Sequence, residues 1–211
     1  MMLLVASLFV VALGGIFELI PTFLVKSNIP TISSVKPYTP LELQGRDIYV
    51  REGCYTCHSQ MIRPFRYEVM RYGEYSKAGE SVYDHPHQWG SKRTGPDLAR
   101  IGGKYPDSWH FNHMFDPTSM APGSVMPRYP WLFERELDLG TTKSKIHAMR
   151  KLGVPYAEGY EAKANDDLTA QAEKIAQGLK ADKITISHKK EIIALIAYLQ
   201  RLGKDIKVEN K

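Results

Sequence analysis

The decapeptide Arg51–Gln60, REGCYTCHSQ, contains both cysteines of this 211-residue chain, two residues apart, with His58 directly after the second. Three kinds of site use a cysteine pair of this spacing: a redox dithiol, half of a zinc site and a covalent attachment site for haem. A redox dithiol would require the pair at the head of a helix that follows a strand, whereas here a predicted helix precedes the cysteines. A zinc site needs four ligands, and since the chain has no other cysteine, histidines such as His85 and His87 would have to complete it.

Covalent haem attachment needs no residue from outside the motif. The thiols of Cys54 and Cys57 would add to the two vinyl groups of haem c, and the two-residue spacer lets both reach the same edge of the ring. His58 would then lie under the ring as the proximal iron ligand. The motif therefore favours one covalently bound haem c over zinc or a dithiol.

The sixth iron ligand is expected well beyond the motif. Met126 lies in PGSVMPRYP, a loop stiffened by three prolines, which could hold a thioether at the iron. The sequence leaves three alternatives open: Met120, His113 and His110. A sulfur ligand favours ferrous iron, and six-coordinate iron leaves no position for a substrate. The sequence thus predicts an electron carrier without catalytic residues of its own.

Composition and charge limit the remaining possibilities. With 43% apolar residues, a chain of this length can bury one sizeable core, so one principal domain is expected. The net charge of +5 would suit an acidic partner or a membrane surface, but the basic residues are scattered. Their densest cluster, over 143–151, lacks interleaved aromatic residues and is typical of a solvated helix face, so we expect no nucleic-acid partner.

The first 25 residues predict a transmembrane anchor. Residues 1–17 carry no charged side chain, and the apolar run resumes after Glu18, which gives the length that a bilayer-spanning helix needs. A cleaved signal peptide would need a basic leader and a small-residue cleavage site, and neither is visible. Gly14 and Gly15 share a helix face with Glu18, so this face either meets another membrane protein or places Glu18 near the headgroups. Pro21 is expected to kink or end the helix.

The remainder divides into a tether over 26–38 and one domain over 39–206. Thr39–Glu42, TPLE, is a capping box that opens a helix closed by Gly53. Further helices are expected at about 107–116, at about 166–179 and in a last apolar stripe that Ser187 caps and Gly203 closes. Long irregular stretches are expected over 60–95 and 127–160. Since no run of alternating strand residues exists, the sequence predicts a mainly α protein with long loop insertions.

This order of elements resembles a class I cytochrome c: a helix, Cys-x-x-Cys-His, a Gly-Pro-x-Leu turn at Thr94–Leu98, a Met-Pro loop and a closing helix. The resemblance implies that the carbonyl of Pro96 accepts a hydrogen bond from His58 and orients it. It also implies that the first and last helices of the domain cross, with Gly45 and Tyr49 on one and Tyr198 on the other. Three residues are candidate neighbours of the haem and its propionates: Arg128, Tyr105 and Trp109.

Longer segments, from about residue 20 to 132 and again in the last helix, resemble the mono-haem cytochrome c subunit (subunit II) of cbb3-type cytochrome c oxidases. That family implies two protein partners, the di-haem cytochrome c subunit (subunit III), which supplies electrons, and the catalytic haem-copper subunit (subunit I), whose haem b receives them. Oxygen reduction and proton pumping would occur in the catalytic subunit. The insertion over 61–93 would be contact surface, with four candidate residues: Arg63, Arg66, Arg71 and Tyr72.

Two alternatives keep the haem but change its use: the small subunit of a nitric oxide reductase, and a gas sensor in which Met126 leaves the iron. A zinc-stapled structural module is the third alternative. Lys26 and Lys36 follow the anchor, so the positive-inside rule alone would put the domain in the cytoplasm. Haem is attached to this motif outside the bacterial cytoplasm, and large domains translocate regardless of charge, so we expect the domain in the periplasm, anchored to the inner membrane.

Overall fold

The computed structural model describes residues 1–25, 30–90 and 92–206, and these form helices joined by turns and loops, with one isolated bridge between Glu136 and Lys190 and no β-strand. The expectation of a mainly α protein is confirmed. The α-helices are α1 (Met2–Leu24), α2 (Pro40–Arg51), α3 (Arg66–Tyr72), α4 (Asp107–Phe115), α5 (Pro117–Met120), α6 (Trp131–Glu134), α7 (Thr142–Lys151), α8 (Ala164–Ala181) and α9 (Glu191–Arg201). Three short 3₁₀ helices are η2 (Cys54–Thr56), η3 (Ala78–Ser81) and η4 (Tyr160–Ala162).

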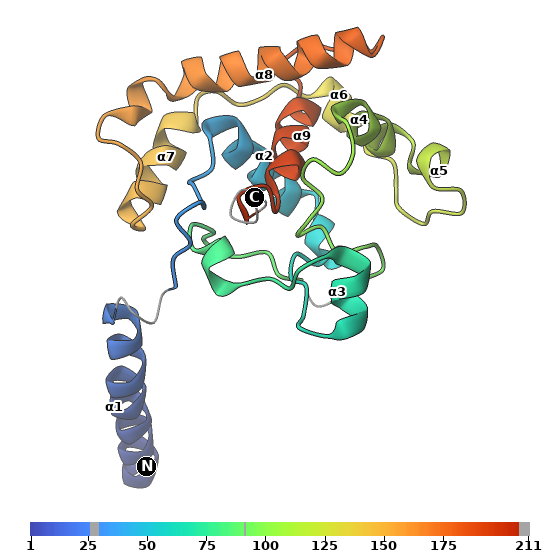
Figure 1. The fold of residues 1–211 in the computed structure, drawn as a ribbon. Helices are drawn as coiled ribbons and strands as arrows, with labels where there is room; N and C mark the ends of the chain where they lie inside the picture. Colours follow the sequence, from blue (N-terminus) through green and yellow to red (C-terminus); the bar gives the residue numbers. More distant parts are fainter. Residues whose placement is uncertain (26–29, 91, 207–211) are drawn as a thin grey trace.

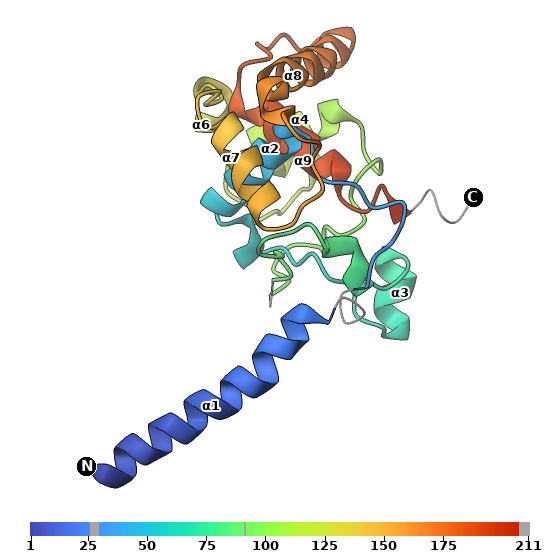
Figure 2. The ribbon, with the colours of Figure 1, turned by 90° about the vertical axis from the view of Figure 1, so that its left-hand side faces the viewer.

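Helix α1 stands apart from the other helices, as Figures 1 and 2 show. Its segment Met2–Thr22 is long and apolar enough to cross a membrane, and its apolar side chains are exposed. This is consistent with a membrane anchor. Pro21 does not end the helix, which continues to Leu24, and the Thr22 hydroxyl donates a hydrogen bond to the carbonyl of Glu18.

Helix α2 begins where the capping box predicts. The Thr39 hydroxyl accepts a hydrogen bond from the Glu42 amide, and the Glu42 carboxylate accepts one from the Thr39 amide at 2.8 Å. Pro40 occupies the first helical position, where its missing amide proton leaves no helical hydrogen bond unmade. The chain leaves the helix through Gly53, whose φ of 71° lies in the left-handed region that glycine adopts without strain.

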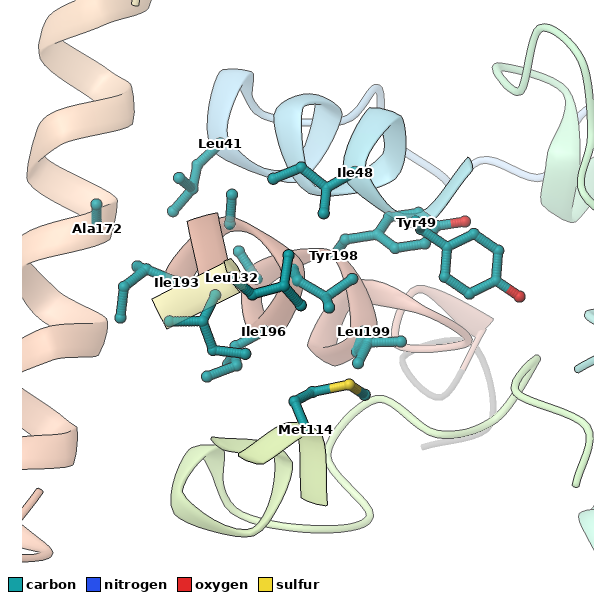
Figure 3. Packing of buried hydrophobic residues seen from close by; sticks show 14 of the residues in the cluster. Leu41, Ile48, Tyr49, Met114, Leu132, Ala172, Ile193, Ile196, Tyr198 and Leu199 are labelled. Carbon is teal, nitrogen blue, oxygen red and sulfur yellow. The ribbon is translucent and has the colours of Figure 1, made fainter. Parts of the chain in front are cut away.

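Helices α2 and α9 cross at the centre of the domain. A Cβ atom added to Gly45 would lie 1.9 Å from the carbonyl oxygen of Ala194 and 2.8 Å from Cβ of Tyr198, so only glycine permits this approach. The expected crossing is therefore confirmed. Figure 3 shows Tyr49 and Tyr198 side by side between the two helices, with ring centroids 5.3 Å apart. Helix α9 is buried along nearly its whole length because other helices surround it.

Two clusters of buried side chains hold α4, α6, α7 and α8. In the main cluster, α4 contributes Met114, α6 contributes Leu132 and α8 contributes Ala172, all packed around α9 (Figure 3). The second cluster fixes α7 against α2 and the start of α8; its buried members are Leu43, Ile146, Met149, Val154 and Ala164. The expected helices at 107–116 and 166–179 correspond to α4 and α8.

Three details of the expected secondary structure are wrong. The stretches over 60–95 and 127–160 were expected to be irregular, but the first contains α3 and the second contains α7. The basic residues of α7 belong to the cluster over 143–151 that the sequence places on a solvated helix face. Ser187 does not cap the last helix, because α9 begins after Lys190, which makes no side-chain cap. Of the expected tether, 26–29 lie outside the described residues, and Lys36 is tied to the domain through hydrogen bonds with Asp205 and Arg201.

Candidate functional site

The cysteine motif follows the end of α2 directly. After the left-handed turn at Gly53, the amides of Cys57 and His58 both donate to the carbonyl of Cys54, at 3.2 and 2.9 Å, which winds the motif into a single tight turn. Both thiols are free; Cys54 is half-buried and Cys57 is exposed. Burial raises the pKa of Cys54 to about 12, so this thiol is protonated at neutral pH. A raised pKa disfavours at Cys54 the thiolate that a redox dithiol needs.

The imidazole of His58 is fixed by a backbone carbonyl far along the chain. Its Nδ1 donates a hydrogen bond to the oxygen of Pro96 at 2.8 Å, which leaves Nε2 as the nitrogen available to a metal. Burial lowers the pKa of His58, which favours the neutral form that ligates iron. Gly95 lies against the ring: a Cβ atom there would be 2.3 Å from Cε1 of His58.

The turn that carries Pro96 is itself attached to the motif. The Gly95 amide donates to the carbonyl of Cys57 at 3.0 Å, and the Leu98 amide donates to the carbonyl of Ser59 at 2.8 Å. The buried carboxylate of Asp97 accepts from the Ser59 hydroxyl at 2.6 Å. The sequence analysis did not predict the contacts that Gly95, Ser59 and Asp97 make in the site. The hydroxyl of Ser59 directly follows His58 and the carboxylate of Asp97 directly follows Pro96, and these positions were the signal that could have found the two residues.

Helix α4 contributes an aromatic stack to the site. The ring of Tyr105 stacks on Trp109 at 4.1 Å between centroids, and Trp109 stacks on His113 at 4.6 Å. Nδ1 of His113 and Nε2 of His110 are buried and have no hydrogen-bond partner in the described structure. The pKa of His113 is lowered by burial and then by the nearby His58, and burial together with His113 lowers that of His110 to about 4.

The loop that contains Met126 returns to the cysteine motif. Met126 is half-buried and packs against the main core cluster. Three residues later, burial and the proximity of the Cys54 and Cys57 thiols raise the pKa of Tyr129 to about 12. The indole nitrogen of Trp131 donates to the Glu52 carboxylate at 2.9 Å. The fold thus brings the predicted ligand loop to the motif.

Of the three expected haem neighbours, two lie together and one lies elsewhere. Tyr105 and Trp109 share the stack with His113. Arg128 is 66% exposed and pairs with Asp116 at 3.0 Å. Met120, an alternative sixth ligand, is half-buried at the end of α5.

The candidate contact residues differ in what they contact. Arg63 precedes α3 and its side chain is 48% exposed; its guanidinium and that of Arg93 hold the fully buried carboxylate of Glu68. These hydrogen bonds, chiefly that of Arg93, lower the pKa of Glu68 to about 2. The Arg71 guanidinium lies over the ring of Tyr72, 5.2 Å from its centroid.

The donor set fits haem better than zinc. Within the described part of the chain no group of three or more His, Cys, Asp or Glu side chains could hold a metal ion, so His85 and His87 do not complete a zinc site with the cysteines. Two free thiols at the spacing of a haem attachment motif, followed by a neutral imidazole with Nε2 available, match the chemistry of a c-type haem. The unpartnered ring nitrogens of His110 and His113 provide further polar groups for a ligand with carboxylates.

Comparison with known protein families gives an independent result. A family model described as "Cytochrome C oxidase, mono-heme subunit/FixO" matches residues 1–206. No curated protein matches the chain. The match covers α1, the cysteine motif and the closing helix α9.

Proposed function

The chain belongs to the FixO family of mono-haem subunits of cytochrome c oxidase, and we propose that it carries one covalent haem c and relays electrons within the oxidase complex. The observation that carries this proposal is the position of His58. Its imidazole directly follows two free thiols at the attachment spacing, and the carbonyl of Pro96 fixes it with Nε2 available.

Each residue of the motif then has one role. Cys54 and Cys57 would form the two thioether bonds, and Nε2 of His58 would bind the iron. The hydrogen bond from Nδ1 to Pro96 selects the tautomer and orients the ring. Met126 would supply a sulfur ligand, from a loop that reaches the motif. When bound, the haem supplies a one-electron ferric–ferrous couple.

We place the subunit between two partners. It receives electrons from the di-haem cytochrome c subunit and delivers them to haem b of the catalytic haem-copper subunit, where oxygen is reduced. Helix α1 anchors it in the bacterial inner membrane, and the domain lies in the periplasm, where haem is attached to this motif. The family match and the exposed apolar surface of α1 support this arrangement.

The outer face of α3 is our candidate for contact with a membrane-embedded oxidase subunit. Phe65, Tyr67 and Met70 are between 49% and 76% exposed, and the segment 61–73 contains three arginines and no lysine. Aromatic residues, methionine and arginine are the types enriched in protein interfaces, and lysine is depleted there.

The place where the chain joins the domain supports this contact. A Cβ atom at Gly79 would lie 2.8 Å from Ile32 and 3.1 Å from the carbonyl of Pro30, so the chain meets the domain at η3 soon after α1 ends. Helix α3 lies only a few residues before η3, so its face is on the part of the domain that is joined to the anchor.

The test is to purify the tagged full-length chain from native membranes in mild detergent and to record the reduced-minus-oxidised visible spectrum of what accompanies it. The proposal predicts c-type and b-type haem together and oxygen consumption with a reduced donor. A c-type signal alone would contradict the proposed partner, and a colourless protein would contradict the haem. As a control, replacement of both cysteines by alanine should abolish the c-type signal.

A further inference from the structure

The stacked imidazole of His113 has a polar atom that the described protein does not satisfy. Its Nδ1 is buried and unpartnered, as is Nε2 of the neighbouring His110, whereas other buried polar side chains of the domain, such as Ser59 and Gln60, are hydrogen-bonded. An imidazole nitrogen that is buried without a partner destabilises a fold, so such atoms usually face a ligand, an ion or an ordered water. The Nδ1 atom therefore indicates a missing partner.

The position of His113 limits what that partner can be. Met114, the next residue on α4, accepts a hydrogen bond from the Tyr129 amide at 3.1 Å, so His113 lies on a helix that is joined to the loop of Met126. Trp109 stacks on His113 and fixes the plane of the ring, and Tyr105 stacks on the other face of Trp109. A neutral imidazole protonated at Nδ1 presents one N–H donor to an acceptor in the site.

We propose that His113 donates a hydrogen bond from Nδ1 to a propionate carboxylate of the haem, with Trp109 as the residue that positions it. This inference rests on the proposed function, which supplies the haem. Both axial positions are assigned to His58 and Met126, so His113 is left to the periphery of the ring.

His113 thus takes the role of hydrogen-bond donor to a propionate, which the sequence suggested for Arg128. The Arg128 guanidinium is two-thirds exposed and engaged with Asp116, whereas the imidazole of His113 is inside the site. A donor to the propionate withdraws part of its negative charge from the iron. Since negative charge near the iron stabilises the ferric state, the His113 hydrogen bond raises the reduction potential.

The test compares two replacements of His113 in the full-length, haem-loaded chain in detergent. His113→Phe keeps an aromatic ring against Trp109 but has no donor, and His113→Asn places an amide N–H near the position of Nδ1. A redox titration followed by visible absorption gives the midpoint potential, and electron paramagnetic resonance of the ferric form reports the axial ligands. His147→Phe, at an exposed histidine on α7, is the matched control.

We expect His113→Phe to lower the ferrous-to-ferric ratio at a fixed potential by up to tenfold, equivalent to 59 mV for a one-electron couple. His113→Asn should recover most of this shift, and all three variants should keep the wild-type axial signature. An altered axial signature in His113→Phe would overturn the inference, because it would identify His113 as an iron ligand. An unchanged midpoint potential would also overturn it, because Nδ1 would then bond a water and not a propionate. Wild-type protein without c-type haem would overturn the proposed function itself, and this is measured first.

Discussion

Replacement of Gly95 by alanine tests whether the packing around His58 sets the geometry of the site. The added Cβ atom would lie 2.3 Å from Cε1, 2.7 Å from Nδ1 and 2.8 Å from Nε2 of His58, where ordinary contacts begin at 3.4 Å. The ring must therefore move by about 1 Å, or the turn must move away from it. Either movement lengthens the 2.8 Å hydrogen bond between Nδ1 and the carbonyl of Pro96.

The expected cost combines overpacking, about 1–3 kcal/mol, with the weakening of one hydrogen bond, about 0.5–1.5 kcal/mol. Gly95→Ala should thus lower the free energy of unfolding by roughly 2–4 kcal/mol and reduce the fraction of chains with a low-spin haem. Denaturant unfolding followed by circular dichroism gives the first quantity, and the ratio of Soret to protein absorbance with the low-spin spectrum gives the second.

The matched control is Gly178→Ala, since Gly178 lies within α8 with nothing within 4 Å of an added Cβ. Alanine favours a helix over glycine by about 1 kcal/mol, so the control should be neutral or slightly stabilised and keep a wild-type spectrum. The φ angle of Gly95 is not in the left-handed region, so the contact with His58 is the sole expected source of harm. A Gly95→Ala protein with wild-type stability and spectrum would refute the reasoning.

Three further predictions follow from other residues. Gly45→Ala forces α2 and α9 apart, because the new Cβ would lie 1.9 Å from the carbonyl of Ala194; we expect a loss of more than about 3 kcal/mol in denaturant unfolding, and a folded variant of wild-type stability would contradict the crossing. Glu68→Gln removes a carboxylate whose pKa is lowered from 4.5 to about 2 in the folded state. The stabilisation by this carboxylate is complete above the unfolded pKa and is lost as pH falls through about 2, so the difference in the free energy of unfolding between wild type and variant should shrink between pH 4.5 and 2. A constant difference would contradict the ion-pair account. Met126→Leu keeps the volume but removes the sulfur, so the potential should fall and exogenous imidazole should bind the iron more readily; an unchanged spectrum and potential would exclude Met126 as the ligand.

The elements that the sequence predicts are those whose signals are local. The start of α2 depends on a capping box contained within four residues, and α9 has a continuous apolar stripe. Helix α3 has no such local signal, because its inward side chain is Glu68, which is buried by pairing with arginines rather than by apolar contact. The hydrophobic period therefore does not mark this helix. Ser187 failed as a cap because residues 188–189 form a turn and Lys190 is extended, so the helix begins only at Glu191.

The site shows the same division between local and distant signals. The cysteines and His58 are contiguous, so their chemistry is readable from spacing alone. The contact between Gly95 and the His58 ring depends on a turn nearly forty residues further along, and Pro96 was expected only because the turn resembles one in class I cytochromes c. The stack of His113 on Trp109 follows from their spacing of four residues on α4, but nothing in the sequence places that face toward His58.

The buried ion network joins the proposed haem site to the proposed contact surface. The guanidinium of Arg93 donates to the Ser59 hydroxyl at 2.7 Å and to the Glu68 carboxylate at 2.8 Å, and it lies 3.4 Å from Asp97. Ser59 and Asp97 belong to the two segments that fix His58, whereas Glu68 belongs to α3.

A partner that binds the outer face of α3 would therefore bind a helix whose inner face is tied to His58, the proposed proximal ligand. Since electron transfer depends steeply on the distance between redox centres, a rigid connection between the docking helix and His58 would fix that distance at the moment of contact. This gives a physical reason for the charged network. An apolar contact could hold α3 as strongly, but the directed hydrogen bonds from the Arg93 guanidinium also fix the orientation of α3 relative to the turn that carries Pro96.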